Sequence, residues 1–376
     1  MQQNGLMRQR ALQSVLLVHA IEQTDLAGDA LSLSDRANAS REALEGWASP
    51  ADAGPAPINR DSERYLARRA AALLALLRVR SPGVDRVLAA AAGAPGLSRA
   101  MLVLAFLAGM AIAFADGNRI DIFAYPLIGL VIWNLVVYLI LIVRLFAHDE
   151  TSAATAQASP MTRGPTTGRL EGLIRRWLAS LYAKSVQARI ERLITHSIGF
   201  NAPLAPGLRR FAADWREVGR PLLQMRAARL LHLAAILAAL GLMAGYDTRG
   251  WILRQLAGWG ATVFGPASAH AALVVLYGAA SAAANVPIPS AHALQALAWT
   301  GPESGGGSAG PWLYLIDWTA LIYIVLPRSL AVILTTLALW RRAARLPTPP
   351  ALTAYLTAVL RSATPPAASP QPRAGG

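Results

Sequence analysis

Long apolar runs interrupt a chain that is otherwise rich in arginine. Four of them approach the length of about 20 residues that a helix needs to cross a bilayer. They cover residues 100–115, 120–143, 230–246 and 312–340. The second run contains only one charged residue, Asp121, and is apolar on all sides, which is typical of a helix in lipid. The pattern predicts four transmembrane helices, and residues 116–121 turn the first two into a hairpin.

A fifth apolar run, Ala267–Ala284, consists mostly of alanine and is bounded by Pro266 and Pro287. Because alanine inserts into a bilayer less readily than leucine or isoleucine, we expect an external or re-entrant helix here. Whether this run spans, re-enters or lies outside stays open. If it spans, the C-terminal tail changes sides.

The segment before the first span predicts three helices. The first, Leu6–Gln23, carries apolar residues at helical spacing. They are Leu12, Val15, Leu16 and His19. Ser34 is expected to cap a second helix that runs through Trp47. The third helix covers Asp61–Val79, and Pro50–Pro57 is predicted to be a loop.

Residues 170–198 show a basic amphipathic pattern, with an apolar stripe that begins at Leu170, Leu173, Ile174 and Trp177. Two interpretations stay open. The helix lies on the inner leaflet, or it packs against the N-terminal helices, which is the favoured interpretation because surface helices of ordinary domains show the same pattern. Residues 149–169 and 363–376 are rich in Thr, Ser, Ala, Pro and Gly and are predicted to be disordered.

The predicted fold class is an all-α integral membrane protein with a helical cytoplasmic module and a helical external segment. The predicted parts are a module (1–98), a transmembrane hairpin (99–146), a linker (147–169), amphipathic helices (170–229), transmembrane helix 3 (230–246), an external segment (247–311), transmembrane helix 4 (312–340) and a tail (341–376).

The distribution of basic residues gives an orientation. Of the 35 Lys and Arg residues, 12 precede Met101, 14 lie between Arg144 and Arg229, and 5 follow Trp340. Only Arg249 and Arg254 lie between the third and fourth spans. Because basic loops stay in the cytoplasm, both termini and the segment after the hairpin are predicted to be cytoplasmic.

Composition agrees with this picture. Of 376 residues, 54% are hydrophobic and 15% are charged, whereas soluble domains average about 25% charged residues. The net charge of +14 belongs to segments beside apolar runs, which favours a lipid bilayer over nucleic acid as the partner. The absence of cysteine excludes disulfides, thiolate metal sites and cysteine nucleophiles. No cleaved signal peptide is expected, since the first apolar run begins near Met101.

Motifs that carry chemistry are sparse. Gly305–Gly310 matches a dinucleotide pattern and a nucleophile elbow in letters, but no strand is expected before it. A GxxxxGK[ST] phosphate loop and a pair of histidines at i, i+4 are both missing. The sequence therefore predicts no catalytic residues, no metal and no cofactor, and a non-enzymatic protein.

The last span carries polar residues that need partners. Asp317 and Arg328 are eleven residues apart, so they share a helix face but lie about 16 Å apart along the axis. Pro327 cannot donate a hydrogen bond to the carbonyl of Tyr323, so we expect a kink and a free acceptor beside Arg328. Asn134 in the second span is a candidate partner across helices. A structural and a functional role for Arg328 both stay open.

Gly241 and Gly245 in the third span have the spacing of a GxxxG contact face. The sequence does not decide whether this contact lies within one chain or between chains, so the oligomeric state stays open. His232, near the inner end of the same span, is interpreted as an interfacial residue.

Several motifs resemble those of a bacterial membrane protein family, domain of unknown function 2868. The resemblance covers residues 10–346. It rests on residues 240–246 ending in Tyr246, on Arg249-Gly250, Gly258-Trp259, 312–317 and 326–328, and on Asp35-Arg36, 39–44 and 68–70. This chain has Gly260 and Ala261 where the family has an acidic residue followed by Ser or Thr.

The resemblance implies a bacterial inner-membrane protein without an assigned activity, and a cytosolic GTPase as the partner. The first hypothesis is therefore a membrane scaffold that docks a cytosolic protein. The second is a channel or transporter that uses the polar face of the last span. A membrane enzyme ranks third, because the sequence contains no convergent set of catalytic side chains.

Overall fold

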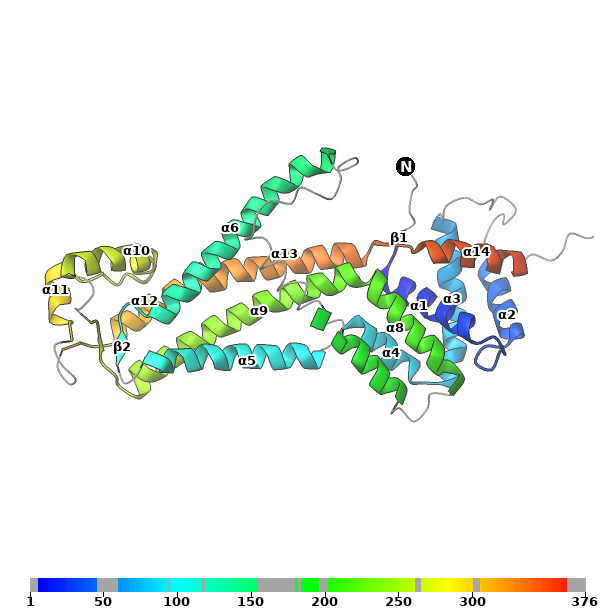
Figure 1. Cartoon of the computed structure of the whole chain (residues 1–376), viewed down its shortest axis with the longest axis horizontal. Helices are drawn as coiled ribbons and strands as arrows, with labels where there is room; N and C mark the ends of the chain where they lie inside the picture. The colour runs from blue at the N-terminus through cyan, green and yellow to red at the C-terminus, as the bar shows by residue number, and fades with distance from the viewer. Residues whose placement is uncertain are drawn as a thin grey trace, which may run out of the picture. The chain divides into compact units, whose positions relative to one another are not determined.

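A computed structural model describes residues 6–45, 60–93, 95–116, 119–154, 180–181, 184–195, 202–260, 265–299 and 305–363. These residues are mostly α-helical, which confirms the all-α class (Figure 1). The chain forms two compact units. Unit 1 comprises Met1–Pro95, Arg176–Arg226 and Leu337–Gly376, and unit 2 comprises Gly96–Arg175 and Ala227–Thr336.

Unit 1 brings together three segments that lie far apart in the sequence. Its helices are α1 (Gln9–Thr24), α2 (Leu33–Leu44), α3 (Arg60–Arg80), α4 (Val84–Ala92), a helix over residues 184–195, α8 (Ala205–Val218) and α14 (Pro350–Ala363). A short antiparallel pair joins β1 (Leu6–Met7) to β4 (Leu346–Pro347). The tail of the chain is therefore part of the same unit as the N-terminal helices.

The apolar periodicity of α1 explains its place at the centre of unit 1. Leu12, Val15 and Leu16 are buried as predicted, and α1 packs against α3 and α8. The predicted start at Leu6 is wrong, because Leu6 and Met7 form β1 instead. The predicted third helix agrees with α3 to within one residue at each end.

The N-cap of α2 differs from the prediction. Ser32, not Ser34, accepts a hydrogen bond from the backbone N–H of Asp35, and the Asp35 carboxylate accepts one from Ser32 N–H. This reciprocal capping box satisfies two backbone donors at once, an advantage that Ser34 does not have. The helix ends at Leu44. Trp47 and Pro50–Pro57 lie outside the described residues.

The helix over residues 184–195 buries its apolar side within the protein. Val186, Ile190 and Ile194 are buried, whereas Arg189 and Arg192 are exposed. This supports packing over an inner-leaflet location for these residues. The start of the predicted amphipathic stripe, from Leu170 to Trp177, lies outside the described residues.

Unit 2 contains the apolar helices. They are α5 (Pro95–Ala113), α6 (Tyr125–Ala154), α9 (Arg220–Asp247, which begins in unit 1), α10 (Pro266–Ala284), α11 (Ala291–Ala296), α12 (Gly310–Ala320) and α13 (Leu326–Ala343, which ends in unit 1). A parallel pair joins β2 (Ile120–Asp121) to β3 (Ala257–Gly258). Helix α6 runs six residues into the stretch from 149 that was predicted to be disordered; residues 155–169 lie outside the description.

Three helical stretches among the described residues are long and apolar enough to cross a membrane. They are Arg220–Ile252, Pro266–Ala284 and Gly310–Ala343, and Ser98–Ala113 and Tyr125–Leu139 are shorter apolar helices. The multi-pass character is thereby confirmed, but the count of four spans is not. The predicted start of the second span at Ile120 is wrong, because Ile120 and Asp121 pair with β3 and the helix begins at Tyr125.

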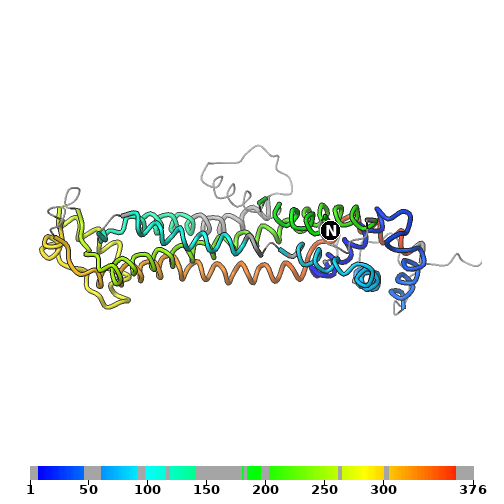
Figure 2. Tube along the Cα trace, turned by 90° about the horizontal axis from the view of Figure 1, so that it is seen from below, coloured from blue at the N-terminus to red at the C-terminus, as the bar shows by residue number. Residues whose placement is uncertain are grey.

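Glycine allows α5 and α9 to pack closely in unit 2, where both views show them side by side (Figure 1 and Figure 2). A Cβ atom on Gly241 would lie 2.0 Å from the carbonyl oxygen of Phe106, and one on Gly109 would lie 1.9 Å from that of Ala238. Gly245 faces Ala113 in the same way. The predicted GxxxG contact therefore exists, and it lies within one chain.

The segment between α9 and α12 is folded around its own aromatic core. Trp259 and Tyr277 are fully buried there, and the Tyr277 hydroxyl donates to the carbonyl of Ile122 at 2.9 Å. Helix α10 packs against α12. After α10 the chain has no helix until α11, and His270 Nδ1 lies 2.9 Å from the carbonyl oxygen of Pro289. The chain thus returns beside the first turns of α10.

Candidate functional site

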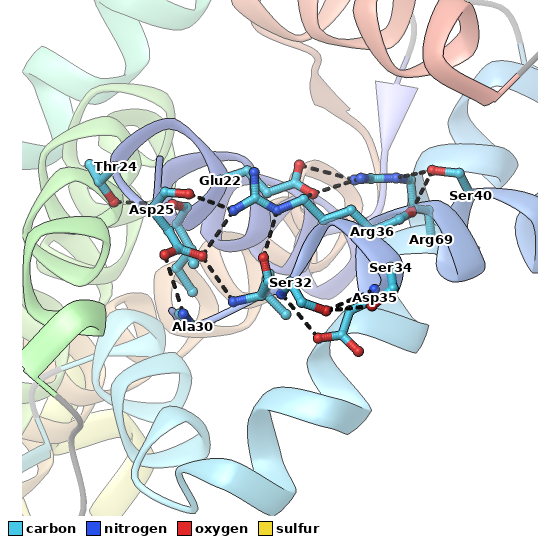
Figure 3. Close-up of polar contacts among 12 residues, drawn as sticks. Glu22, Thr24, Asp25, Ala30, Ser32, Ser34, Asp35, Arg36, Ser40 and Arg69 are labelled. Carbon is cyan, nitrogen blue, oxygen red and sulfur yellow. Dashed lines mark hydrogen bonds and ion pairs between the residues drawn. The ribbon is translucent and has the colours of Figure 1, made fainter. Parts of the chain in front are cut away.

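A rigid loop in unit 1 is built around the carboxylate of Asp25. This side chain is only 2% exposed and accepts hydrogen bonds from the backbone N–H groups of Ala30 (3.2 Å) and Leu31 (2.9 Å). It also accepts one from the guanidinium of Arg36 at 2.9 Å (Figure 3). Gly28 adopts a φ of 78°, which favours glycine. Burial alone raises the pKa of Asp25, but these hydrogen bonds outweigh it and lower the pKa.

Arginine side chains fix the same loop from two further directions. Arg36 donates to the backbone carbonyls of Asp25 (2.6 Å) and Leu31 (3.0 Å). Arg80, at the end of α3, donates to the carbonyl of Ala30 at 2.8 Å and to the carboxylate of Asp35 at 2.9 Å. We call residues 25–36, which comprise this loop and the first turn of α2, the Asp25 loop. Its backbone is held by charged groups on α2 and α3.

Large apolar side chains are exposed to solvent on this loop and at the neighbouring end of α3. Leu26 is 90% exposed and Leu33 is 80% exposed, and Val79, the neighbour of Arg80, is 86% exposed. Exposed apolar residues on a fixed surface are typical of interaction sites. The contacts of Arg80 with Ala30 and Asp35 place the end of α3, which carries Val79, beside the loop. We refer to the three exposed residues Leu26, Leu33 and Val79 as the apolar patch.

A second polar cluster joins three N-terminal helices to the tail. Arg69 on α3 is 3% exposed; it donates to both carboxylate oxygens of Glu22 on α1 (2.6 and 3.1 Å) and to the hydroxyl of Ser40 on α2 (2.9 Å). Figure 3 shows the Glu22, Ser40 and Arg69 side chains together. Arg69 also donates to the Tyr355 hydroxyl of α14, which in turn donates to Glu22. We call these four residues the Arg69 network.

The network holds α14 against the helical module through a buried ion pair. Burial, and next the negative charge of Glu22, raise the pKa of Tyr355 well above its ordinary value, so the hydroxyl keeps its proton. The ring of His19 lies against the ring of Tyr355, with 4.6 Å between centroids. Burial lowers the pKa of His19, which favours the neutral imidazole.

In unit 2 the structure joins two of the predicted intramembrane residues. Arg328 is 3% exposed, and its Nε donates to Asn134 Oδ1 at 2.7 Å. One terminal nitrogen lies 2.9 Å from His232 Nδ1. A guanidinium only donates, so this nitrogen of His232 accepts and the ring proton is on Nε2. The interpretation of His232 as an interfacial residue missed this contact.

The last span is irregular next to Pro327, where a kink was predicted. A π-helical turn, Leu321–Val325, ends two residues before the proline. The carbonyl of Tyr323 accepts a hydrogen bond from the Tyr138 hydroxyl at 3.1 Å. The guanidinium of Arg328 lies over the ring of Tyr138, 5.4 Å from its centroid. The acceptor freed by Pro327 is therefore used by a neighbouring helix, which favours a structural role for this cluster.

None of these hydrogen bonds joins Asp317 to the Arg328 cluster. Its Oδ1 atom is buried and has no hydrogen-bond partner among the described residues. The structure assigns no binding partner to Asp317.

The family-motif residues stabilise the end of α9 and the segment that follows. Arg249 is fully buried and donates to Gln255 at 2.8 Å and to the backbone carbonyls of Ala113 and Arg119. The first of these carbonyls ends α5, where a cation compensates the helix dipole. Tyr246 lies beneath the same guanidinium, at 5.8 Å from its ring centroid.

The other motif residues pack closely. A Cβ atom on Gly250 would lie 2.5 Å from Leu313, and one on Gly258 would lie 2.3 Å from the indole nitrogen of Trp299. Trp259 is fully buried and donates to the carbonyl of Leu294 at 2.9 Å. These residues therefore serve the fold of unit 2, and none of these contacts resembles a catalytic arrangement.

An apolar cavity of about 370 Å³ lies among α5, α6 and α9. Its lining includes Gly109, Trp133 and Leu242 and contains almost no polar surface. Such a cavity offers no groups for coordinating an ion or a polar substrate.

Sequence reasoning missed the Asp25 loop and the Arg69 network. Asp35, Arg36 and Arg69 are among the residues on which the predicted family resemblance rests, but Glu22 and Tyr355 carry no pattern of their own. The signal that could have revealed this ion pair is the presence of a charged residue, Glu22 or Arg69, within the apolar face of α1 or α3.

No family model, curated protein or solved structure matches this chain. The resemblance to domain of unknown function 2868 therefore stays a prediction.

Proposed function

We propose that this chain is a non-enzymatic inner-membrane scaffold whose unit 1 docks a cytosolic protein. The observation that carries the proposal is the apolar patch, which the Asp25 loop and the adjoining end of α3 expose to solvent. Side chains such as Leu26 and Leu33 contribute about 1.5 to 3 kcal/mol each when they are buried, so a surface that leaves them in water gains from a partner. The rigid loop adds to this, since its backbone does not have to be ordered on binding.

We infer the membrane topology from the three chain segments that make up unit 1. Its three segments are separated by α5 with α6 and by the stretch from α9 to α13. A single compact unit lies on one side of a membrane, so each separation contains an even number of crossings. Helices α5 and α6 supply two, and α9 with the stretch Gly310–Ala343 supplies two. The arginine content of the unit 1 segments then favours the cytoplasmic side.

On this count α10 does not cross the bilayer, although it is long and apolar enough. The chain that follows α10 supports this. Residues 286–289 are not helical, and they run back towards His270 near the start of the helix. Extended backbone exposed to lipid lacks hydrogen-bond partners, so this pair of segments fits an external location better than a transmembrane one.

A GTPase is the partner that the family resemblance implies, and we propose it on that basis alone. The chain has no phosphate loop of its own, so nucleotide hydrolysis would be supplied by the partner. The exposed patch on unit 1 provides a surface that such a partner can reach.

Substitution of the apolar patch tests the docking proposal. The tagged protein would be purified in mild detergent from its own organism, and co-purifying cytosolic proteins would be quantified by mass spectrometry. Leu26→Asp with Leu33→Asp should remove the partner, whereas the control Ala213→Asp, at an exposed position on α8, should retain it. An identical set of proteins from all variants, or no cytosolic protein with the parent chain, would contradict docking.

A channel or transporter is the second candidate, because Arg328 is a buried cation on an apolar helix. Its contacts with Asn134 and His232 fix it inside the protein, so these contacts favour a structural role over transport. Flux through reconstituted vesicles provides the test. If Arg328→Lys changes ion or solute flux in a chain that still folds, the transport function gains over the scaffold.

A further inference from the structure

The end of α13 changes abruptly from apolar to basic. Exposed apolar side chains at i, i+3, i+4 and i+7 form one face of the helix. They are Leu330, Ile333, Leu334 and Leu337. Trp340, which is 80% exposed, comes next, and three exposed arginines follow it directly. These are Arg341, Arg342 and Arg345. We call Trp340 and the three arginines the α13 collar; all four residues belong to unit 1.

The helical stretch that carries the collar has the length of a membrane crossing. Gly310–Ala343 is one apolar helical stretch, and Tyr314 near its other end is exposed like Trp340. The 26 positions from Tyr314 to Trp340 cover about 39 Å at about 1.5 Å per residue. A bilayer with its headgroups is about 40 to 45 Å thick. Because tyrosine and tryptophan concentrate at both interfaces, this spacing puts the collar arginines at headgroup level.

No side chain among the described residues forms a hydrogen bond or an ion pair with the collar arginines. Elsewhere in unit 1, exposed arginines such as Arg78 and Arg209 pair with carboxylates at 2.9 Å. The collar arginines lack such a partner in the described part of the chain, and they lie beside an exposed indole. Anionic lipid headgroups attract basic residues in this position next to an apolar helix.

We propose that the α13 collar binds the phosphate of an anionic phospholipid in the leaflet that faces unit 1. A guanidinium presents a planar fork of donors that matches phosphate oxygens. The Trp340 indole combines an apolar ring with one N–H donor, which suits the boundary between acyl chains and headgroups. Each arginine near an anionic surface contributes about 1 kcal/mol, or roughly fivefold in affinity. Binding here requires no cytosolic protein, so the inference is independent of the docking proposal.

The two kinds of side chain in the collar favour a lipid over other occupants. A soluble phosphate would pair with the arginines but would leave the Trp340 ring and Leu337 in water. A second copy of the chain would bring the arginines of two collars together, and like charges at close range are destabilising. A phospholipid carries its phosphate beside acyl chains, so it satisfies both the arginines and the apolar side chains.

The position of the collar gives a bound lipid a structural consequence. Arg345 immediately precedes β4, whose residues Leu346 and Pro347 pair with β1. Leu346 is buried, so the chain passes from an exposed arginine into the core of unit 1 within one residue. A headgroup held by the collar therefore fixes the point where the C-terminal segment enters unit 1.

Brominated lipids provide the test, because bromine on an acyl chain quenches the fluorescence of a tryptophan that it contacts. The purified chain would be reconstituted into phosphatidylcholine vesicles with about 5 mol% phosphatidylglycerol as the anionic lipid. The phosphatidylglycerol is brominated in one preparation, and an equal mole fraction of the phosphatidylcholine is brominated in the other. Subtracting the signal of Trp340→Phe from that of the parent chain isolates Trp340 from the other tryptophans.

A tenfold preference is less than two arginines would supply at roughly fivefold each. At about 5 mol% such a site holds the anionic lipid about one third of the time, against about one twentieth for random mixing. Brominated phosphatidylglycerol should therefore quench Trp340 several-fold more than brominated phosphatidylcholine. Replacing all three collar arginines by glutamine should abolish this difference. Replacing them by lysine, which keeps the charge, should retain most of it.

A matched control removes the same charge elsewhere in unit 1. Arg64→Gln, Arg78→Gln and Arg209→Gln together change three exposed arginines that are paired with carboxylates on α3, α4 and a helix of residues 184–195. This variant should keep the preference of the parent chain for the anionic lipid. An equal loss of preference in the control would assign the effect to net charge and overturn the site.

Four further results overturn the inference. Equal quenching by the two brominated lipids means that the collar has no headgroup preference. Absence of quenching by either lipid places Trp340 outside the bilayer. A preference that survives the glutamine substitutions arises elsewhere in the chain. Loss of the preference with inorganic phosphate, but not with sodium chloride of the same ionic strength, assigns the arginines to a soluble anion. Co-purification of a partner through Leu26 and Leu33 is unaffected by any of these results, so failure of the lipid site is separable from failure of docking.

Discussion

Replacing Arg69 by leucine should destabilise unit 1 more than any single surface substitution. The change removes the guanidinium that donates to Glu22, Ser40 and Tyr355. Glu22 then keeps a carboxylate whose side chain is only 8% exposed, and the cation that remains beside it is Arg36 at 4.0 Å. A buried charge that loses its partner costs about 3 to 5 kcal/mol.

The double substitution Glu22→Leu with Arg69→Leu should recover most of that loss. It replaces the buried ion pair with apolar groups, an exchange that is often neutral or stabilising. Tyr355→Phe removes one hydroxyl and leaves the ion pair, so we expect a loss of about 1 kcal/mol. The order of stability of these three variants distinguishes a coupled network from three independent contacts.

A buried thiol can report the opening of unit 1 without interference from unit 2. Ala90→Cys, at a fully buried position of α4, would be introduced into every variant. The rate of thiol modification would be measured in detergent at increasing urea. A loss of about 3 kcal/mol corresponds to a roughly hundredfold faster reaction when opening is a rapid pre-equilibrium.

The reasoning fails if Arg69→Leu changes the modification rate less than about fivefold, which corresponds to less than about 1 kcal/mol. It also fails if the double substitution is as unstable as Arg69→Leu alone. Arg68→Leu provides the matched control, because Arg68 is exposed and makes one 3.4 Å contact with the carbonyl of Glu45.

Three further predictions concern packing, capping and pH. Gly241→Val should prevent the close packing of α5 on α9 and cost about 1 to 3 kcal/mol or more, seen as a lower Tm in detergent, whereas Gly129→Ala, with open space around its Cβ, should leave the Tm unchanged. Ser32→Ala should cost about 1 kcal/mol in the thiol assay and Ser34→Ala less, and the reverse order would support the cap expected from sequence. Asp25 has a folded-state pKa below its ordinary value of 3.8, so its contribution to stability is present above that value and is lost as pH falls through the folded pKa. Asp25→Asn should therefore flatten the fall in unit 1 stability below about pH 4, and an unchanged acid profile would exclude this role.

The local sequence pattern was sufficient to predict helices that are held mainly by apolar contacts. The spacing of Leu12, Val15 and Leu16 predicted α1, and the apolarity of the long runs predicted two of the three described helical stretches that are long enough to cross a membrane. The pairing of Arg328 with Asn134 was predictable as well. A buried cation has to find an acceptor, and Asn134 is a rare polar residue on an apolar run.

The remaining features depend on contacts between distant segments. Glu22 and Tyr355 are 333 positions apart, and neither is marked by a motif. The capping box of Ser32 was missed because two serines lie within reach and only the position of Asp35 decides between them. The start of α6 at Tyr125 depends on the pairing of β2 with β3, whose partner strand lies beyond α9 in the sequence.

The location of the three unit 1 segments on one side of the membrane is the central claim, and thiol accessibility tests it most directly. Single cysteines would replace Asp29, Ala188, His292 and Ala354, which are all exposed. Intact cells would then be treated with a membrane-impermeant maleimide before and after permeabilisation. The account predicts that the cysteine in place of His292 reacts in intact cells, and that the three cysteines in unit 1 react only after permeabilisation. Labelling of one or two of those three in intact cells would place parts of unit 1 in different compartments and contradict the account.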